Sequence, residues 1–249
     1  MPPQSAAPSQ VDGNKGHAME LVTLCLTIGK RPDLLKRTLD SLLASVEFKQ
    51  IIAINDFRDD ATNEMFKRLC PQGQLISPDH QLGHHKAVDH MYRLISTPYV
   101  FHCEDDWVFD ETIDLHSAML LLEANANISQ VCLRKVADFH MPEDARAQIL
   151  DCEENGHHYH RLDKLHAQWH GFTFNPHLAK LDVWKQLGGF APFKKERHIS
   201  RHIRSQGGFT AYMFPGCCEH IGERQSVSPS AANPTGLRLW RKKLKRFFM

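Results

Sequence analysis

Hydrophobic residues near the start of the chain alternate between continuous runs and helical spacing. Residues 21–28 are almost entirely apolar and residues 51–54 form a second, shorter run, as expected for strands that are buried on both faces. Between these runs, Pro32 suits a first helical turn, and leucines then recur with the spacing of one helix face: Leu34, Leu35, Leu39, Leu42 and Leu43. This pattern predicts a strand, a helix and a second strand.

The same alternation continues along the following segment. Helical spacing marks residues 61–69 and 87–95, a weak apolar run lies at residues 74–77, and Pro98 opens a further run. Strands that alternate with helices predict a parallel sheet with helices on its faces. The expected fold class is therefore α/β, with an open, mostly parallel, Rossmann-like sheet that is covered on both faces.

Three adjacent acids, Glu104, Asp105 and Asp106, follow the run that Pro98 opens, and apolar residues resume at Trp107. Like charges in contact raise one another's pKa, and a divalent cation removes that cost. Carboxylate oxygens suit Mg²⁺ or Mn²⁺, and open α/β sheets bind ligands at the carboxyl ends of their strands. The acids therefore predict a divalent-cation site, with a solvated acidic turn as the alternative.

Other polar residues stand just after the predicted strands. Thr27 ends the first run, and Asn55 and Asp56 follow the second. The strand ends of such a sheet meet in one crevice, so these side chains are expected to lie near the three acids. Neither G-x-G-x-x-G nor G-x-x-x-x-G-K-[ST] occurs, which argues against a dinucleotide-binding or P-loop site.

Composition places the chain among ordinary globular proteins. Its 249 residues are 42% hydrophobic and 24% charged, enough to bury a sizeable core. The seven cysteines form no C-x-x-C pair, which favours a reducing, cytoplasmic compartment, and Cys217 and Cys218 are expected to be buried thiols. No apolar run is long enough to span a membrane, and residues 1–19 have the composition of a disordered leader.

Five segments, taken in order, resemble the GT-A glycosyltransferases of the broad family 2 type. The acids at 104–106 stand where that family carries its D-x-D motif, and the resemblance extends over a predicted domain at residues 20–225. The segments are residues 27–32 with 39–42, residues 54–56, residues 83–101, residues 104–106, and residues 187–190 with Glu196 and residues 207–209.

The resemblance implies a nucleotide-sugar donor and a divalent cation, Mn²⁺ or Mg²⁺. It places Asp56 at the base, Thr27 along the nucleotide pocket, Glu104 at the ribose and Asp106 on the metal, with Asn55 and Asp105 in the same donor-binding group. Two departures from the family pattern are the amide Asn55 and the longer acid Glu104, where acidic Asp residues are usual. For Thr27, a role as a strand-end cap stays open.

Positive charge near the donor phosphates is expected from Arg31 and Lys86, with solvated surface charge as the alternative. The resemblance also assigns Glu196, which opens a predicted helix over residues 199–205, as the general base of an inverting transfer. A helix N-terminus favours its ionised form. His220 matches a family histidine that reaches the metal, and a structural hydrogen-bonding role stays open.

Histidines are concentrated between residues 153 and 170, where two interpretations compete. His166 and His170 are four residues apart, so a helix would present both to a zinc ion, whereas the polar composition favours a mobile loop near the site. Residues 169–176 resemble the acceptor-side strand of the family. In this segment the aromatic ring of Trp169 is expected either to stack on a sugar or to pack in the core. A helix is then expected to end at Gly188 and Gly189.

The composition of the last segment predicts a linker at residues 226–236 and a basic amphipathic tail at residues 237–249. The tail has six basic residues and no acid. Apolar residues fall on one helical face of the tail, which predicts an interfacial helix on anionic lipid. We therefore expect a cytoplasmic protein, peripheral at the inner face of the membrane. Nucleic-acid contact by the tail is the alternative, and no nucleic-acid partner is expected.

Together these features predict a sugar transfer from a nucleotide-diphosphate sugar to a hydroxyl acceptor, in the synthesis of a surface glycan or a lipid-linked saccharide. The acceptor is then a glycan or a lipid-linked molecule. Two other functions remain open: a nucleotidyltransferase on a similar sheet, and a non-catalytic nucleotide- or glycan-binding module.

Overall fold

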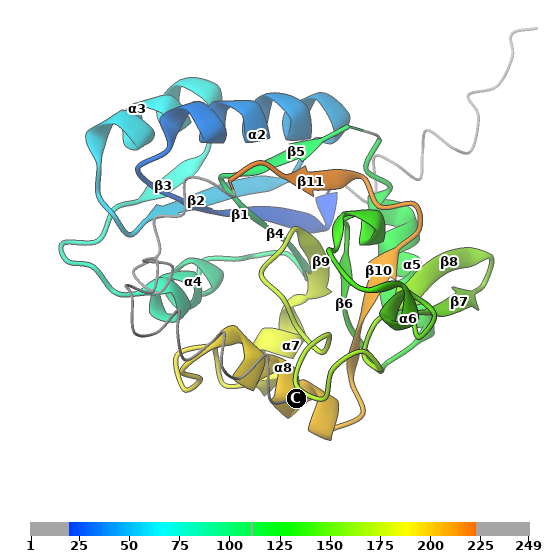
Figure 1. Cartoon of the computed structure of the whole chain (residues 1–249). Coiled ribbons are helices and arrows are strands. Elements are labelled where there is room, and N and C mark those ends of the chain that lie inside the picture. Colours follow the sequence, from blue (N-terminus) through cyan, green and yellow to red (C-terminus); the bar gives the residue numbers. More distant parts are fainter. Residues whose placement is uncertain (1–19, 111, 223–249) are drawn as a thin grey trace, which may run out of the picture.

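The computed structural model describes residues 20–110 and 112–222. The predicted leader, linker and basic tail lie outside these ranges. The described residues form one nine-stranded sheet, in the order β3-β2-β1-β4-β9-β6-β10-β8-β7, and a small two-stranded sheet. Helices cover both faces of the large sheet (Figure 1), so the predicted open α/β sheet is confirmed.

The first half of the sheet is parallel, as predicted. β1 (Val22–Ile28) lies between β2 (Gln50–Asn55) and β4 (Tyr99–Glu104), and β3 (Gln74–Ile76) extends the sheet beyond β2. Because these strands run in one direction, their carboxyl ends, with the polar residues that follow them, lie along one edge.

Helices from this half pack on opposite faces. α2 (Pro32–Ser45) and α3 (Asp60–Leu69) lie on one face, and α4 (His84–Tyr92) lies on the other with α7 (Leu181–Gln186) and α8 (Glu196–Ser205) (Figure 1). Alternate residues of β1 serve the two faces: Leu24 packs with α2, whereas Cys25 packs with α4. Both faces of the sheet are therefore buried, which explains the continuous apolar runs.

The second half of the sheet is mixed. β9 (His177–Lys180) runs antiparallel between β4 and β6 (Ile128–Cys132), and β10 (Phe209–Met213) runs parallel to β6. A hairpin of β7 (Leu150–Glu154) and β8 (His157–Arg161) closes the far edge of the sheet. Three helices lie in the connections of this half: α5 (Leu115–Ala124), the 3₁₀ helix η1 (Val136–Asp138) and α6 (Glu143–Arg146).

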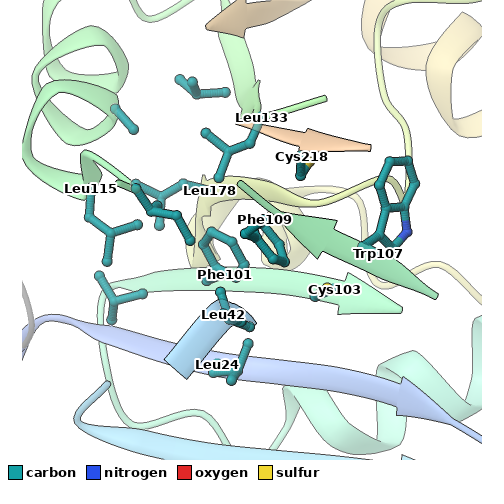
Figure 2. Packing of buried hydrophobic residues seen from close by; sticks show 14 of the residues in the cluster. Leu24, Leu42, Phe101, Cys103, Trp107, Phe109, Leu115, Leu133, Leu178 and Cys218 are labelled. Carbon is teal, nitrogen blue, oxygen red and sulfur yellow. The ribbon is translucent and has the colours of Figure 1, made fainter. Parts of the chain in front are cut away.

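A small sheet of β5 (Trp107–Phe109) and β11 (Cys218–His220) covers the end of β4. Phe101 and Phe109 lie in contact beneath it, with ring centroids 6.1 Å apart, in the core that also holds Leu178 (Figure 2). Cys217 and Cys218 are buried and unbridged, as predicted. This sheet brings the end of the described chain back beside the three acids.

Two predictions for the second half are wrong. Residues 153–161 belong largely to the β7–β8 hairpin rather than to a loop, because polar residues are tolerated on a strand at the sheet edge. Residues 169–176 are bends and irregular chain, and the strand begins only at His177. His166 and His170 do not share a helix, and no group of three or more side chains in the described ranges is arranged to hold a metal ion. The zinc interpretation therefore lacks support.

Candidate active site

The three acids lie at the carboxyl end of β4, at the edge that the parallel strands share. Glu104 is the last residue of β4 and stands beside Thr27 of β1 in the parallel register. Asp105 is almost fully buried and accepts a hydrogen bond of 2.9 Å from the backbone N–H of Gly29. A Cβ at position 29 would lie 2.4 Å from the ring of Phe57, so only glycine lets the β1–α2 loop pass this close to the end of β2.

Arg31 connects two of these acids. Its guanidinium donates to Asp105 and, at 2.6 Å, to Asp106, and the three side chains are only 11%, 1% and 7% exposed. Pro32 begins α2 directly after Arg31, which places the arginine at the helix start, facing the end of β4. The predicted role of Arg31 near the donor phosphates stays a prediction, and in the structure its charge is shared between two carboxylates.

Removing Arg31 is expected to destabilise the protein. Arg31→Met leaves two buried carboxylates without their cation, and breaking a buried pair on one side typically costs about 3–5 kcal/mol. Urea unfolding at pH 7 measures the change. Arg37→Met on the exposed face of α2 is the matched control and should change the free energy of unfolding little. Equal stability of the two variants would contradict a structural role for the Arg31 pairs.

Asp106 has the features of a metal ligand. Its Oδ2 accepts from Arg31 and lies 3.1 Å from Nε2 of His220, whereas its buried Oδ1 has no partner in the described ranges. Gly222 packs against this carboxylate, since a Cβ there would lie 2.1 Å from Oδ2. One unpartnered carboxylate oxygen beside a histidine fits a cation such as Mn²⁺, which takes its remaining ligands from substrate phosphates and water.

The three acids differ in protonation. Burial raises the pKa of Glu104 to about 8, and the charges of Asp106 and Glu196 act in the same direction. Burial also raises the pKa of Asp105 to about 7, against the opposing effect of Arg31. Burial acts upward on Asp106 as well, but the hydrogen bond to His220 and the charge of Arg31 outweigh it, so its pKa is lowered. Asp106 is therefore the acid that stays ionised at neutral pH.

Glu196 is the first residue of α8, as predicted, and belongs to the same site. Its charge contributes to the raised pKa of Glu104, which places the two carboxylates near each other. Burial raises the pKa of Glu196 to about 7, although hydrogen bonds from Thr173 and from the backbone of Phe174 act against it. Burial thus outweighs the expected influence of the helix N-terminus, and a pKa near neutrality suits a general base.

The remaining predicted donor-site residues have mixed surroundings. Asp56 accepts hydrogen bonds from the backbone N–H groups of Leu82 and Gly83, at 2.7 and 2.9 Å, and so holds the start of α4 near the end of β2. Asn55 is buried, and its side-chain amide donates to Asp59 in the following loop and, at 2.8 Å, to Asn63 Oδ1 in α3. Lys86 is exposed on α4 and makes no ion pair with the acids.

Arg134 is a residue that sequence reasoning missed. It follows β6, bridges to Cys218 of β11, and its guanidinium carbon lies 5.6 Å from the centroid of the Trp107 ring and 4.2 Å from that of Phe139. No motif marks it, because its place near the acids depends on β6 and β11 meeting across more than eighty residues of chain. A basic residue two positions after a buried strand was the one available signal.

Comparison with protein families shows which family the chain belongs to. The family model described as "Glycosyl transferase family 2" matches residues 24–196, which include β1, the three acids and Glu196. The chain belongs to this family. The match ends at Glu196, so Arg134 lies within it and His220 lies beyond it.

Solved structures support the same fold. A mannosyltransferase from Pyrobaculum calidifontis, determined with GDP-mannose and Mn²⁺, superimposes with a TM-score of 0.60 at 16% sequence identity. The match covers 82% of this chain and 58% of that protein, so the chain spans little more than half of its length. The likeness shows a GT-A fold. No match was found among curated proteins, and no helix in the described ranges is long and apolar enough to cross a membrane.

Proposed function

We propose that this glycosyltransferase is a metal-dependent, inverting enzyme that moves a sugar from a nucleotide-diphosphate sugar to a hydroxyl acceptor. The observation that carries the proposal is the meeting of an ionised Asp106, with an unpartnered oxygen, and Glu196, with a pKa near 7, at one edge of the sheet. These two acids can serve the two halves of the reaction, departure of the diphosphate and removal of a proton from the acceptor.

The donor side would be formed by the ends of β1, β2 and β4. Thr27, Asn55, Asp56, Glu104 and Asp105 are proposed to surround the nucleoside, and Arg31 and Lys86 to supply positive charge near the phosphates. Asp106 and His220 would hold the cation, which as a Lewis acid stabilises the negative charge of the leaving diphosphate. The neighbour's GDP-mannose and Mn²⁺ support this assignment.

On the acceptor side, Glu196 would take the proton of the attacking hydroxyl. The Thr173 hydroxyl and the Phe174 backbone orient its carboxylate, and the half-buried position keeps its pKa near the operating pH. The hydroxyl would attack the face of the sugar opposite the leaving diphosphate while the carboxylate removes its proton. Attack on that face inverts the configuration of the anomeric carbon.

A screen of nucleotide sugars tests the proposal. GDP-mannose, UDP-glucose, UDP-N-acetylglucosamine and related donors should raise the melting temperature in the presence of Mn²⁺, because a ligand that binds only the folded state stabilises it. Slow release of free sugar from the stabilising donor would separate an enzyme from a binding module. Release of diphosphate from a nucleoside triphosphate, with no response to any nucleotide sugar, would instead favour the nucleotidyltransferase.

Transfer should depend on pH through Glu196. The base must be ionised, so kcat/KM is expected to fall as pH decreases through about 7, where Glu196 becomes protonated, and to level off above it. Rates measured between pH 5.5 and 9 at saturating Mn²⁺ give the profile. His198→Gln, on the same helix, should keep this limb. A rate that is constant from pH 6 to 8.5 would exclude a base with this pKa.

Membrane association is proposed for the basic tail, residues 237–249, which lies outside the described residues. Deleting the tail should abolish co-sedimentation with anionic phosphatidylglycerol vesicles while donor binding persists. Binding of the full chain should weaken as salt rises, since exposed charges are screened over about 8 Å at physiological ionic strength. Neutral phosphatidylcholine vesicles are the control, and unchanged sedimentation after truncation would refute the proposal. A lipid-linked or surface-glycan acceptor would be consistent with such a location.

A further inference from the structure

Arg134 differs from every other half-buried arginine in the described part of the chain. Arg31, Arg161 and Arg204 each pair with a carboxylate. Arg134 pairs with none in residues 20–110 and 112–222, and its buried Nε has no hydrogen-bond partner there. Its guanidinium lies over the rings of Trp107 and Phe139, which accept no conventional hydrogen bond from its N–H groups.

An unpaired guanidinium in such a place is costly. Partial burial removes water from the charge, and the cation–π contacts with two rings offset only part of that loss. The five N–H donors of arginine form a rigid fork that matches an oxyanion. A half-buried arginine with aromatic support and unused donors therefore has the properties of an anion-binding residue.

Arg134 shares neighbours with both of the acids that we propose to act in the reaction, Asp106 and Glu196. The Trp107 ring contacts Arg134 and also lies beside His220, with the centroids of the Trp107 and His220 rings 5.0 Å apart. One residue, Trp107, therefore separates Arg134 from the proposed metal ligand His220. Towards α8, the charges of Arg134 and Glu196 both act on Tyr212 and on Cys132. Arg134 and Glu196 therefore lie near the same two side chains.

The strand order distinguishes the donor from the acceptor as the source of the anion. The proposed donor residues lie at the carboxyl ends of β1, β2 and β4, whereas Arg134 follows β6, which is separated from β4 by β9. Arg31, which pairs with Asp105 and Asp106, is the basic residue beside the acids on the proposed donor side. An anion at Arg134 therefore belongs to the molecule that approaches from the Glu196 side.

We propose that Arg134 binds an oxyanion, a phosphate or a carboxylate, on the acceptor substrate. The acceptor then carries this anion close to the hydroxyl that receives the sugar. The assignment to an acceptor rests on the proposed glycosyl transfer, whereas the anion site itself rests only on the contacts of Arg134.

Calorimetry with small anions tests the site. Phenyl phosphate and benzoate are titrated into the full chain, first without nucleotide and then with GDP or UDP and Mn²⁺ present, and benzyl alcohol serves as the neutral probe. At least one anion should bind saturably in both states, and Arg134→Gln should weaken it by about tenfold or more, as expected for lost charged hydrogen bonds. Comparison of the two anions assigns the phosphate or carboxylate class.

The variants separate binding from folding. Arg134→Lys keeps the charge but loses the fork, so it should bind the anion more weakly than wild type and more tightly than Arg134→Gln. It also replaces Arg134→Gln if thermal unfolding shows that the latter is not folded. Arg93→Gln, an exposed arginine at the end of α4, is the matched control and should leave anion affinity unchanged. Affinity for GDP or UDP with Mn²⁺ should stay within about twofold in every variant, since donor and acceptor anions are held by different residues.

Three results would overturn the inference: no anion binding by the wild type, wild-type anion affinity in folded Arg134→Gln, or a loss of nucleotide affinity in place of anion affinity. The last would move Arg134 to the donor diphosphate. Failure of the wild type to bind any nucleotide would count against the proposed function alone, because anion binding is also measured in its absence.

Discussion

Glu196→Gln is expected to lower glycosyl transfer by about two to four orders of magnitude, the usual contribution of a positioned general base. The amide has nearly the shape of the carboxylate and can keep its position at the start of α8, but it cannot accept the proton of the acceptor hydroxyl. Donor affinity should be unchanged, because Glu196, the first residue of α8, is proposed to act on the acceptor and not on the donor. Turnover with the donor found in the nucleotide-sugar screen, alongside calorimetry of that donor, measures both effects.

The matched control is Glu143→Gln. Glu143 also opens a helix, α6, but is exposed and makes no contact with the acids, so its replacement should leave turnover unchanged. The pH limb near 7 should disappear in Glu196→Gln and persist in the control. Near-normal turnover in Glu196→Gln would remove Glu196 from the mechanism. His198 would then be the next base to test, because its pKa is lowered by desolvation and by flanking basic residues.

The parallel half of the fold was predictable because its signals are local. β1 and β2 are continuous apolar runs, and the leucines of α2 mark one helix face, so each element could be recognised without knowing its partners. Glu104 ends the central strand and Asp106 stands two residues later, so both could be placed at the carboxyl end of that strand. The acid that opens α8 was found by the resemblance to the family.

The antiparallel half was harder to predict, because its strands are short and their pairing is distant. β9 has four residues, one of them the buried His177, and its partners β4 and β6 belong to other parts of the chain. In the sequence alone, a short run that contains a polar residue cannot be distinguished from a loop. It is recognised as a strand only when its pairing with β4 and β6 is known. The position of Arg134 was hard to predict for the same reason, because it bridges to Cys218 of β11, which is more than eighty residues later in the chain.

Protonation states at the site also required the structure. Three adjacent acids suggest mutual repulsion of similar groups, yet the side chains separate into an ionised Asp106 and two acids, Glu104 and Asp105, with raised pKa values. The difference comes from the partners: Asp106 has His220 as well as Arg31, whereas burial dominates at Glu104. Environment rather than residue type thus separates the proposed metal ligand from its neighbours.

Asp106→Asn is the second large effect that we expect. It removes a ligand charge from the proposed cation site, and the loss of a ligand should cost at least the roughly tenfold that replacing a supporting residue of a metal site typically costs. The affinity of GDP or UDP should therefore fall at least tenfold when measured with Mn²⁺ and change little when measured in chelator. The ratio of these affinities is the informative quantity, because a general loss of folding would lower both.

Asp182→Asn is the control for this comparison, since Asp182 is an exposed acid of α7 that pairs only with Lys185, and its ratio should equal that of wild type. His220→Gln should give a smaller change in the same direction, because Asp106 retains its charge and its unpartnered oxygen. Equal nucleotide affinity of the wild type in Mn²⁺ and in chelator would exclude a metal-dependent donor site. An unchanged ratio in folded Asp106→Asn would move the cation away from Asp106, and the neighbouring acids Glu104 and Asp105 would then be its remaining carboxylate ligands.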